Sequence, residues 1–348
     1  MKIWLPSVRA RSGADVYVQR LAEGLRAHGA EPIVQWLPHA FQYFPWAMLR
    51  LSPPAGTDVI GTTSWTAFAF RHHSIPLVAT ALHCVAGRGY PQWKSLPQAL
   101  FHDQMVRRFE RASFRAADAV VAISDSTRQE VSEDFGTRNV HTIPLWIDSE
   151  IFSPGPSRTA TGSEPTRVLI VGNMSRRKGG DLISPFCDAL GRDFDVTVVA
   201  GLRGERPKVA AQGAGLRFMS GLTQDQLVAA YRETDIVVSL SRHEGFGYTA
   251  LEGMACGKPV GAFNVSGLRD VVVNGTSGFL VEVEDVAGLA EACRALRRDP
   301  ALAAHMGLNG RERAVSVFAE GRSIEAHLRL YSDLLSRRGR PSEQHTIT

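Results

Sequence analysis

The chain has 348 residues, enough for two domains of ordinary size, each with its own hydrophobic core. Hydrophobic residues make up 44% of it and charged residues 21%, a composition that excludes disordered and collagen-like chains. Basic residues exceed acidic ones by 39 − 35 = 4, and residues 1–155 alone hold 15 basic and 13 acidic residues, so this diffuse excess gives no reason to expect a nucleic-acid partner.

The first half alternates short apolar runs with segments of helical periodicity, which is the pattern of βα units that build a parallel sheet. Residues 14–28 place apolar side chains on one helical face and end before Gly29. A second helix is expected over residues 96–116. The expected strands are residues 1–5, 32–36, 58–61, 77–83, 119–123 and 140–143.

Residues 153–165 interrupt this series, because ten of the thirteen are Ser, Pro, Gly or Thr. A second α/β series then follows. Its expected strands are residues 168–171, 196–200, 235–240 and 259–263, and its expected helices are residues 179–190, 223–233, 246–255, 285–298 and 302–335.

We therefore predict two Rossmann-like, doubly wound parallel-sheet α/β domains facing a central cleft. The first domain spans residues 1–155 and the second residues 156–336, with the last helix able to pack back on the first domain; residues 337–348 form a polar tail. Such folds bind ligands at the carboxyl ends of their strands, so the cleft is the expected site.

A glycine turn between a predicted strand and a predicted helix carries the most chemical information. Gly245 and Gly247 allow a tight turn, and the free amides at the start of the helix would face an anion such as phosphate. Glu244 precedes the turn, and Glu252 follows eight residues later, roughly 12 Å along a helix. Because a carboxylate repels phosphate, we expect one Glu to bind hydroxyls of a sugar and the other those of a ribose.

A basic loop follows the first strand of the second series. Lys178 would neutralise a diphosphate, and the sequence leaves open whether Arg176 or Arg177 assists it. In the first domain, Gly13 makes the corresponding turn and His83 ends a strand, so both would face the same cleft.

Glu244 and Glu252, with Gly-Phe-Gly between them, resemble the Glu-x7-Glu signature of the retaining family-4 nucleotide-sugar glycosyltransferases, which have the GT-B fold. The likeness covers most of the chain, including the turn at Gly13 and residues 77–83, 121–124, 143–148, 178–179 and 274–280. It implies that Glu244 contacts the donor sugar, Glu252 the ribose and Lys178 the diphosphate. It also implies that the amides of Gly245, Phe246 and Gly247 bind sugar or phosphate, and that His83 lines the sugar pocket.

Two positions depart from the family pattern. An Arg usually follows the glycine of the first strand in the second domain, and here that residue is Asn173, so one phosphate-neutralising charge is absent unless Arg176 or Arg177 replaces it. The paired glycines of the first turn are reduced to Gly13 with Ala14.

The expected activity is retaining transfer of a hexosyl unit from a nucleoside diphosphate sugar to a hydroxyl of a glycan, lipid-linked or small-molecule acceptor, in glycan, polysaccharide or glycoconjugate biosynthesis. GDP-mannose and UDP-hexoses are both open as donors. Glu244, His83 and Lys178 are the expected catalytic residues, and neither a metal nor another cofactor is expected. Two alternatives stay open: a nucleotide-sugar epimerase or hydrolase, and a non-catalytic partner subunit that binds sugar nucleotide.

The remaining features concern compartment and surface. The four cysteines are widely spaced, which fits neither a zinc site nor a disulfide framework, and no apolar run suggests a signal peptide or membrane span, so we expect a cytoplasmic protein. An aromatic stretch at residues 39–49 would line the acceptor site, face lipid or pack under a long loop, and the sequence leaves these alternatives open. A basic helix face is either solvated surface or a site of peripheral association at the inner face of a membrane. That face consists of Arg107, Arg108, Arg111 and Arg115.

Overall fold

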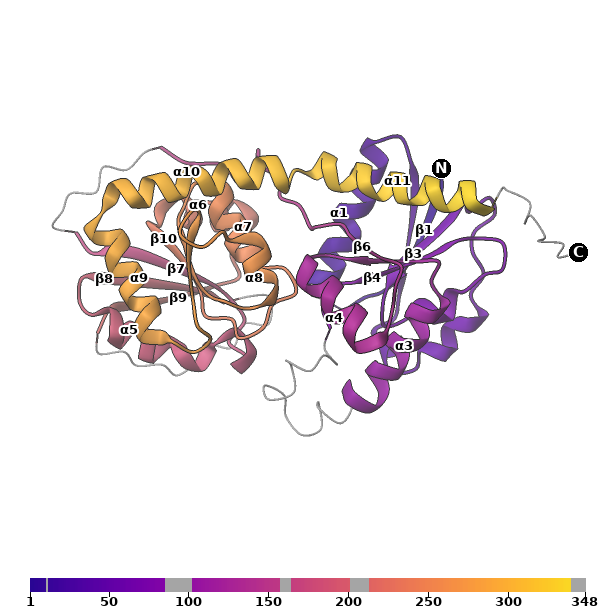
Figure 1. The fold of residues 1–348 in the computed structure, drawn as a ribbon, viewed down its shortest axis with the longest axis horizontal. Helices are drawn as coiled ribbons and strands as arrows, with labels where there is room; N and C mark the ends of the chain where they lie inside the picture. The colour runs from indigo at the N-terminus through magenta and orange to yellow at the C-terminus, as the bar shows by residue number, and fades with distance from the viewer. Residues whose placement is uncertain (11, 85–101, 157–163, 201–212, 339–348) are drawn as a thin grey trace, which may run out of the picture.

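The computed structural model describes residues 1–10, 12–84, 102–156, 164–200 and 213–338. Within these ranges the strands form two parallel sheets of six strands each, and each sheet is packed between helices (Figure 1). The predicted fold class is therefore confirmed. Strand β4 shows why the pattern was readable: all five of its residues are buried, as expected for a strand covered on both faces.

The first sheet has the strand order β2-β1-β3-β4-β5-β6. Its strands are β1 (Lys2–Val8), β2 (Glu31–Leu37), β3 (Val59–Thr63), β4 (Leu77–Ala81), β5 (Ala119–Ala122) and β6 (Val140–Thr142). Its helices are α1 (Gly13–Ala27), α3 (Arg107–Ala116) and α4 (Asp125–Phe135), with short turns η1 (His39–Gln42), η2 (Pro45–Arg50) and η3 (Ala67–Phe70) and a π-helix η5 (His102–Val106). Residues 96–101 of the predicted second helix lie outside the described residues.

The second sheet has the order β12-β11-β10-β7-β8-β9. Its strands are β7 (Thr166–Gly172), β8 (Phe194–Ala200), β9 (Gly215–Ser220), β10 (Ile236–Ser239), β11 (Val260–Phe263) and β12 (Gly278–Val281). Its helices include η6 (Arg176–Lys178), η7 (Gly180–Leu182), α5 (Ile183–Leu190), α6 (Gln224–Glu233), α7 (Tyr248–Ala255) and α8 (Ser266–Val271). Strand order reverses between β7 and β10, which is the topological switch point where such sheets bind ligands.

The end of the chain crosses from the second domain to the first (Figure 1). After α9 (Val286–Arg298), the helix predicted over residues 302–335 is two helices, α10 (Pro300–Val317) and α11 (Glu320–Arg338). They separate where the Ile147 amide donates to the Phe318 carbonyl at 3.0 Å, because the chain passes between the domains there. Helix α11 then packs on α1, so closely that a Cβ at Gly24 would overlap Ile324.

A buried polar cluster fastens α11 to the first domain. The Nδ1 of His327 donates to the Ser323 carbonyl at 2.8 Å, which leaves Nε2 to accept from the Tyr17 hydroxyl at 3.3 Å. The same hydroxyl lies 3.3 Å from the Thr80 hydroxyl of β4. Burial lowers the pKa of His327 from 6.5 to about 4, so the ring is neutral at physiological pH.

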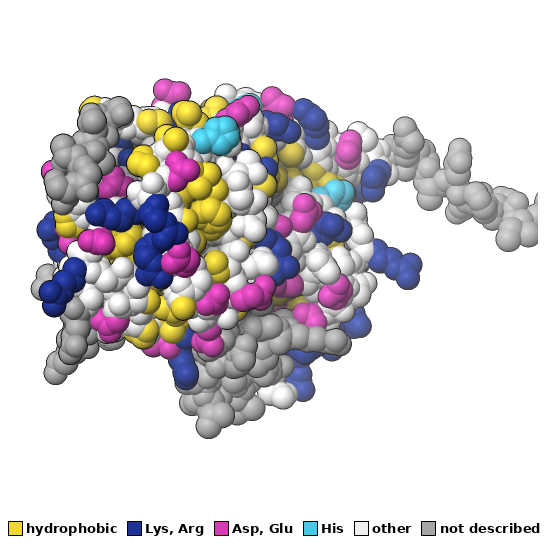
Figure 2. All heavy atoms as spheres, turned by 60° about the vertical axis from the view of Figure 1, so that its left-hand side comes forward, with side chains coloured by type: hydrophobic (Ala, Val, Ile, Leu, Met, Phe, Trp, Pro, Cys, Tyr) yellow, Lys and Arg dark blue, Asp and Glu magenta, His cyan; other side chains and the backbone are white. Residues whose placement is uncertain are grey.

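Other features concern the surface and the cysteines. Figure 2 shows acidic and basic side chains interspersed on the face that the second domain presents, without a large area of one sign. All four cysteines lie within the described residues, and they are free and buried. Among the helices of those residues, none is both long and apolar enough to cross a membrane.

The His327 cluster predicts a pH-dependent stability. Below about pH 6.5 the imidazole is protonated in the unfolded chain but stays neutral in the folded one. The contribution of His327 to the free energy of unfolding should therefore fall by about 3 kcal/mol as the pH drops to about 4. The variant His327→Gln offers both a donor and an acceptor but does not titrate, so the fall in its free energy of unfolding, measured with urea over the same pH range, should be smaller by that amount. His305→Gln, at an exposed position on α10, is the control. If the free energy of unfolding depends equally on pH in the wild type and in His327→Gln, the proposed role of His327 is contradicted.

Candidate active site

Two loops of the second domain meet at the switch point, one after β7 and one after β10. Gly179 adopts the left-handed conformation, with φ of 73°, and lies so close to the Leu240 carbonyl that a Cβ would collide with it. The Arg242 amide donates to the Arg177 carbonyl at 2.8 Å. These contacts join the loops directly, because β7 and β10 are neighbours in the sheet.

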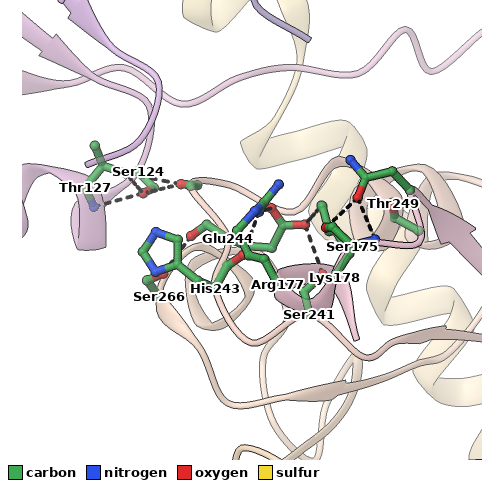
Figure 3. Close-up of polar contacts among 12 residues, drawn as sticks. Ser124, Thr127, Ser175, Arg177, Lys178, Ser241, His243, Glu244, Thr249 and Ser266 are labelled. Carbon is green, nitrogen blue, oxygen red and sulfur yellow. Dashed lines mark hydrogen bonds and ion pairs between the residues drawn. The ribbon is translucent and has the colours of Figure 1, made fainter. Parts of the chain in front are cut away.

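The two loops bring Glu244 against two cations (Figure 3). Lys178 Nζ donates to Glu244 Oε1 and forms an ion pair with it, and Arg177 Nη1 lies 3.7 Å from Oε2. The Ser241 hydroxyl donates to Oε1 at 3.3 Å. The Glu244 side chain is only 12% exposed. Burial raises the pKa of its carboxyl, but Lys178 and Arg177 outweigh burial and hold the pKa below its ordinary value, so Glu244 is ionised.

The structure separates the two arginines that the sequence left open. Arg177 Nη1 also donates to the His243 carbonyl at 2.9 Å, which fixes its guanidinium beside Glu244. Arg176 turns away, 70% exposed and 3.8 Å from Asp181. Asn173 is exposed, and its side-chain oxygen accepts from the Ser175 hydroxyl at 2.6 Å, so it shapes the loop.

Sequence reasoning missed Arg242, the buried arginine that supports this arrangement. Its guanidinium binds both oxygens of Asp181, at 2.6 and 3.0 Å, and donates to Glu284 at 2.6 Å. One side chain thus joins the loop after β10, the loop after β7 and the loop after β12. Burying Arg242 without these carboxylates would be unfavourable, so the three loops hold one another in place.

The glycine turn leads directly into α7. Gly247 precedes the helix with φ of 106°, a conformation that favours glycine, and it makes no side-chain capping bond. The first amides of α7 therefore lack the side-chain oxygen that usually caps a helix.

The first domain contacts the second at this turn (Figure 3). The Gly245 carbonyl accepts from the hydroxyls of Ser124, at 2.8 Å, and Thr127, at 3.2 Å. Gly245 also packs against the backbone of Leu82 and the Cβ of His83, a half-buried residue that lies two positions beyond β4. Sequence reasoning did not identify Ser124 or Thr127 as contacts of this turn.

Further residues extend this interface. The Ser126 amide donates to Asp270 and the Ser126 hydroxyl to the Ser266 carbonyl, both at 2.9 Å. Gly13 begins α1 at the carboxyl end of β1, and a Cβ there would meet no heavy atom of the described residues within 4 Å.

Glu252 lies further along α7 in a different environment. Its Oε2 accepts from the Tyr231 hydroxyl of α6 at 2.7 Å. Burial raises the pKa of Glu252 to about 7, although the Tyr231 hydrogen bond and the charge of Arg20 oppose that rise. The two carboxyls of the motif thus differ: Glu244 is firmly ionised, whereas Glu252 is balanced near neutral pH. No group of three His, Cys, Asp or Glu in the described ranges could hold a metal ion.

Comparison with known proteins identifies the family. The family model "Glycosyl transferases group 1" matches residues 156–313, and "Glycosyltransferase Family 4" matches residues 35–151. D-inositol 3-phosphate glycosyltransferase 1 of Catenulispora acidiphila is 31% identical over 338 residues, covering 88% of this chain and 79% of that protein. The chain belongs to the family-4-like GT-B glycosyltransferases.

Other similar proteins agree with this assignment. Glycogen synthase of Mycobacterium tuberculosis is 30% identical, over 71% of this glycosyltransferase and 60% of that enzyme. Sucrose-phosphate synthase from Thermosynechococcus elongatus has a TM-score of 0.80 at 22% identity, over 97% of this chain and all of that one. Anabaena Alr3699/HepE in complex with UDP has a TM-score of 0.72 at 18% identity, over 96% and 100% of the two chains. The predicted family and the GT-B fold are confirmed.

The close approach at Gly245 predicts a substitution that separates the domains of the glycosyltransferase. The backbone of Gly245 is outside the left-handed region, so Ala suits it locally, but the atoms nearest its Cβ all belong to Leu82 and His83 of the first domain. Gly245→Ala should therefore increase the radius of gyration in small-angle scattering with little change in melting temperature. Gly321→Ala, whose Cβ would lie 3.9 Å from the nearest heavy atom, should leave both unchanged. An unchanged radius for Gly245→Ala would refute the contact.

Proposed function

We propose that this glycosyltransferase transfers a hexosyl unit with retention from a nucleoside diphosphate sugar, GDP-mannose or a UDP-hexose, to an acceptor hydroxyl. The observation that carries the proposal is the half-buried ion pair of Glu244 with Lys178, at the switch point and beside the uncapped start of α7. A donor with a diphosphate and sugar hydroxyls offers each member of the pair a new partner: the diphosphate for Lys178 and the hydroxyls for Glu244.

Donor binding would exchange partners at the pair. Lys178 would turn to the diphosphate. Arg177 would be the second cation, because Asn173 occupies the position where the family usually has an Arg. The first amides of α7 would face the same phosphates. Glu244 would then be free to accept hydrogen bonds from the sugar hydroxyls. Glu252, one of whose oxygens is already bonded to Tyr231, would accept from the ribose with the other.

The chemical step needs stabilisation of the leaving diphosphate. Lys178, Arg177 and the α7 amides would provide it as fixed charges and dipoles, a contribution worth several kcal/mol in enzymes, without a metal ion. We propose same-face attack, in which the leaving phosphate oxygen accepts the proton of the acceptor hydroxyl. His83, beside Gly245, would line the sugar pocket from the first domain.

Similar proteins support one class of donor and more than one class of acceptor. HepE has solved structures in complex with UDP and with UDP-glucose, which supports a nucleoside diphosphate sugar as the donor here. Relatives include a D-inositol 3-phosphate glycosyltransferase and a glycogen synthase, which supports small-molecule and glycan acceptors. We propose lipid-linked acceptors as well, in glycan, polysaccharide or glycoconjugate biosynthesis.

A donor panel followed by kinetics tests the proposal. UDP-glucose or GDP-mannose should raise the melting temperature, and NMR of the product should show the donor's anomeric configuration. Lys178→Met and Glu244→Gln should each lower kcat/KM by at least ~100-fold, because both groups contact the donor. Arg176→Gln, at the neighbouring exposed side chain, is the matched control.

Three outcomes would contradict the proposal. An inverted product would refute retention. Epimer formation, or donor hydrolysis that an added acceptor does not divert, would favour the epimerase or hydrolase alternative. Full activity of an assembled complex containing Glu244→Gln would favour a non-catalytic partner subunit.

We further propose that the protein is cytoplasmic and associates peripherally with membranes through the first domain. Three aromatic residues are exposed around η2: Tyr43 at 45%, Phe44 at 56% and Trp46 at 47%. The Trp46 ring lies 6.2 Å from the Phe109 ring of α3, which joins this segment to the basic helix. The exposed basic residues of that helix are Arg108, Arg111 and Arg115. Exposed aromatic side chains and a basic helix in the same domain suit an anionic lipid surface.

Vesicle sedimentation tests this surface. The protein should pellet with vesicles of phosphatidylglycerol and phosphatidylcholine more than with phosphatidylcholine alone. The double variant Phe44→Ser with Trp46→Ser should reduce the bound fraction at least ~5-fold, because it removes buried apolar area at the lipid surface. Leu308→Ser, at a 69% exposed position in the second domain, is the control. Equal pelleting of wild type and the double variant would refute the surface.

A further inference from the structure

Arg20 is a side chain of the first domain that reaches the donor-side helix of the second. It lies on α1, one turn after the buried Tyr17, and its guanidinium carbon is 5.4 Å from the ring centroid of Tyr248. Tyr248 is the first residue of α7, directly after the glycine turn. A guanidinium at this distance from an aromatic ring is a favourable cation–π contact. The two domains therefore touch on a second side of the glycine turn, apart from the contact of Ser124 with Gly245.

The geometry of α7 connects this contact to Glu252. Tyr248 and Glu252 are four residues apart on the helix, so their side chains lie on the same face. The charge of Arg20 acts on both groups, and it lowers the pKa of each against the effect of burial. Burial raises the pKa of Glu320, at the start of α11, and the charge of Arg20 opposes that rise. Arg20 is thus held among groups from α7 and α11.

We propose that Arg20 is a positioning residue: from its place over Tyr248 it holds the start of α7 and supports Glu252, on the same helix face, as the acceptor for the donor ribose, so that donor affinity depends on contact between the domains. This inference rests on the proposed function, because it concerns the same nucleotide site. It adds a first-domain residue to a binding site formed otherwise by second-domain residues around Glu252.

The chemistry of ribose recognition explains why the ionised form matters. An ionised carboxylate only accepts hydrogen bonds, so it suits two neighbouring hydroxyl donors, whereas a protonated carboxyl would spend one oxygen as a donor. The Tyr231 hydroxyl already donates to Oε2 of Glu252, so protonation of Oε1 would weaken the acceptor proposed for the ribose. A cation beside Glu252 opposes that protonation.

Several elements present polar or charged groups toward Glu252 and the end of α7. Arg20 is a cation whose charge lowers the pKa of that carboxyl against the effect of burial. The groups are Tyr231 and Arg232 on α6, Arg20 on α1, Tyr248, Cys256 and Lys258 on or after α7, and Arg311 of α10, which donates to the Ala255 carbonyl at 2.8 Å. Burial raises the pKa of Glu252, and the charge of Arg20 lowers it. Removing Arg20 should therefore raise that pKa above its present value of about 7.

Calorimetric titration of the full chain with UDP and with GDP, between pH 6 and 8.5, tests this inference. In the wild type, the affinity for whichever nucleotide binds should fall about fivefold from pH 7 to pH 6, because binding requires ionised Glu252. Arg20→Gln should weaken binding at least about twofold at pH 7 and move the midpoint of the pH profile upward by at least half a unit. Arg20→Lys should restore part of the affinity, and Arg26→Gln, on an exposed turn of the same helix, should match the wild type.

The variant Glu252→Gln is the second test in the same titration. It should abolish this pH dependence, and adding Arg20→Gln to it should shift no midpoint. Wild-type affinity and midpoint in Arg20→Gln would overturn the role of Arg20 while leaving the proposed function intact, and so would a uniform loss at every pH. Failure of the wild type to bind either nucleotide would overturn both.

Discussion

The ion pair between Lys178 and Glu244 is the interaction on which the site depends. A charged side chain buried without a partner is strongly unfavourable, so each of these groups requires the other until a ligand replaces it. The fold meets this requirement by placing β7 and β10 side by side, so that the loops after them meet. Arg242 holds the same loops through Asp181 and Glu284. The pair therefore forms a charge-neutral arrangement that an anionic, hydroxyl-rich ligand can replace.

The second constraint is the contact between domains, which gives the site its two sides. Gly245 approaches Leu82 so closely that a methyl group would separate them, and its carbonyl binds the start of α4. On the other side, α11 is fastened to α1 through His327, and α1 carries Arg20 to Tyr248. Contacts far apart in the sequence therefore keep the glycine turn and α7 in one position relative to the first domain.

How much of this the sequence predicts depends on the range of each contact. The alternation of strands and helices and the Glu244–Glu252 spacing are local patterns, so the fold class and the motif were predictable. Strand β9 was not predicted, because most of its residues are only partly buried or exposed and its apolar run is weak. The break at Phe318 and Ala319 results from pairing with Ile147, which no local pattern encodes.

The site shows the same division. Arg176 and Arg177 are adjacent in a basic loop, and only the fold decides that Arg177 faces Glu244 while Arg176 faces Asp181. Arg242 and Arg20 carried no sequence signal, because their partners lie 42 or more residues away. Residues outside a motif that support it through distant charges are therefore the ones that sequence reasoning misses.

A structure of the protein with bound UDP or GDP would test the central claim most directly. The account predicts the diphosphate at the start of α7, with Lys178 Nζ moved from Glu244 to a phosphate oxygen at about 2.8 Å and the Glu244 carboxylate released toward the sugar position. A nucleotide bound elsewhere, or bound there while Lys178 keeps its ion pair with Glu244, would contradict it.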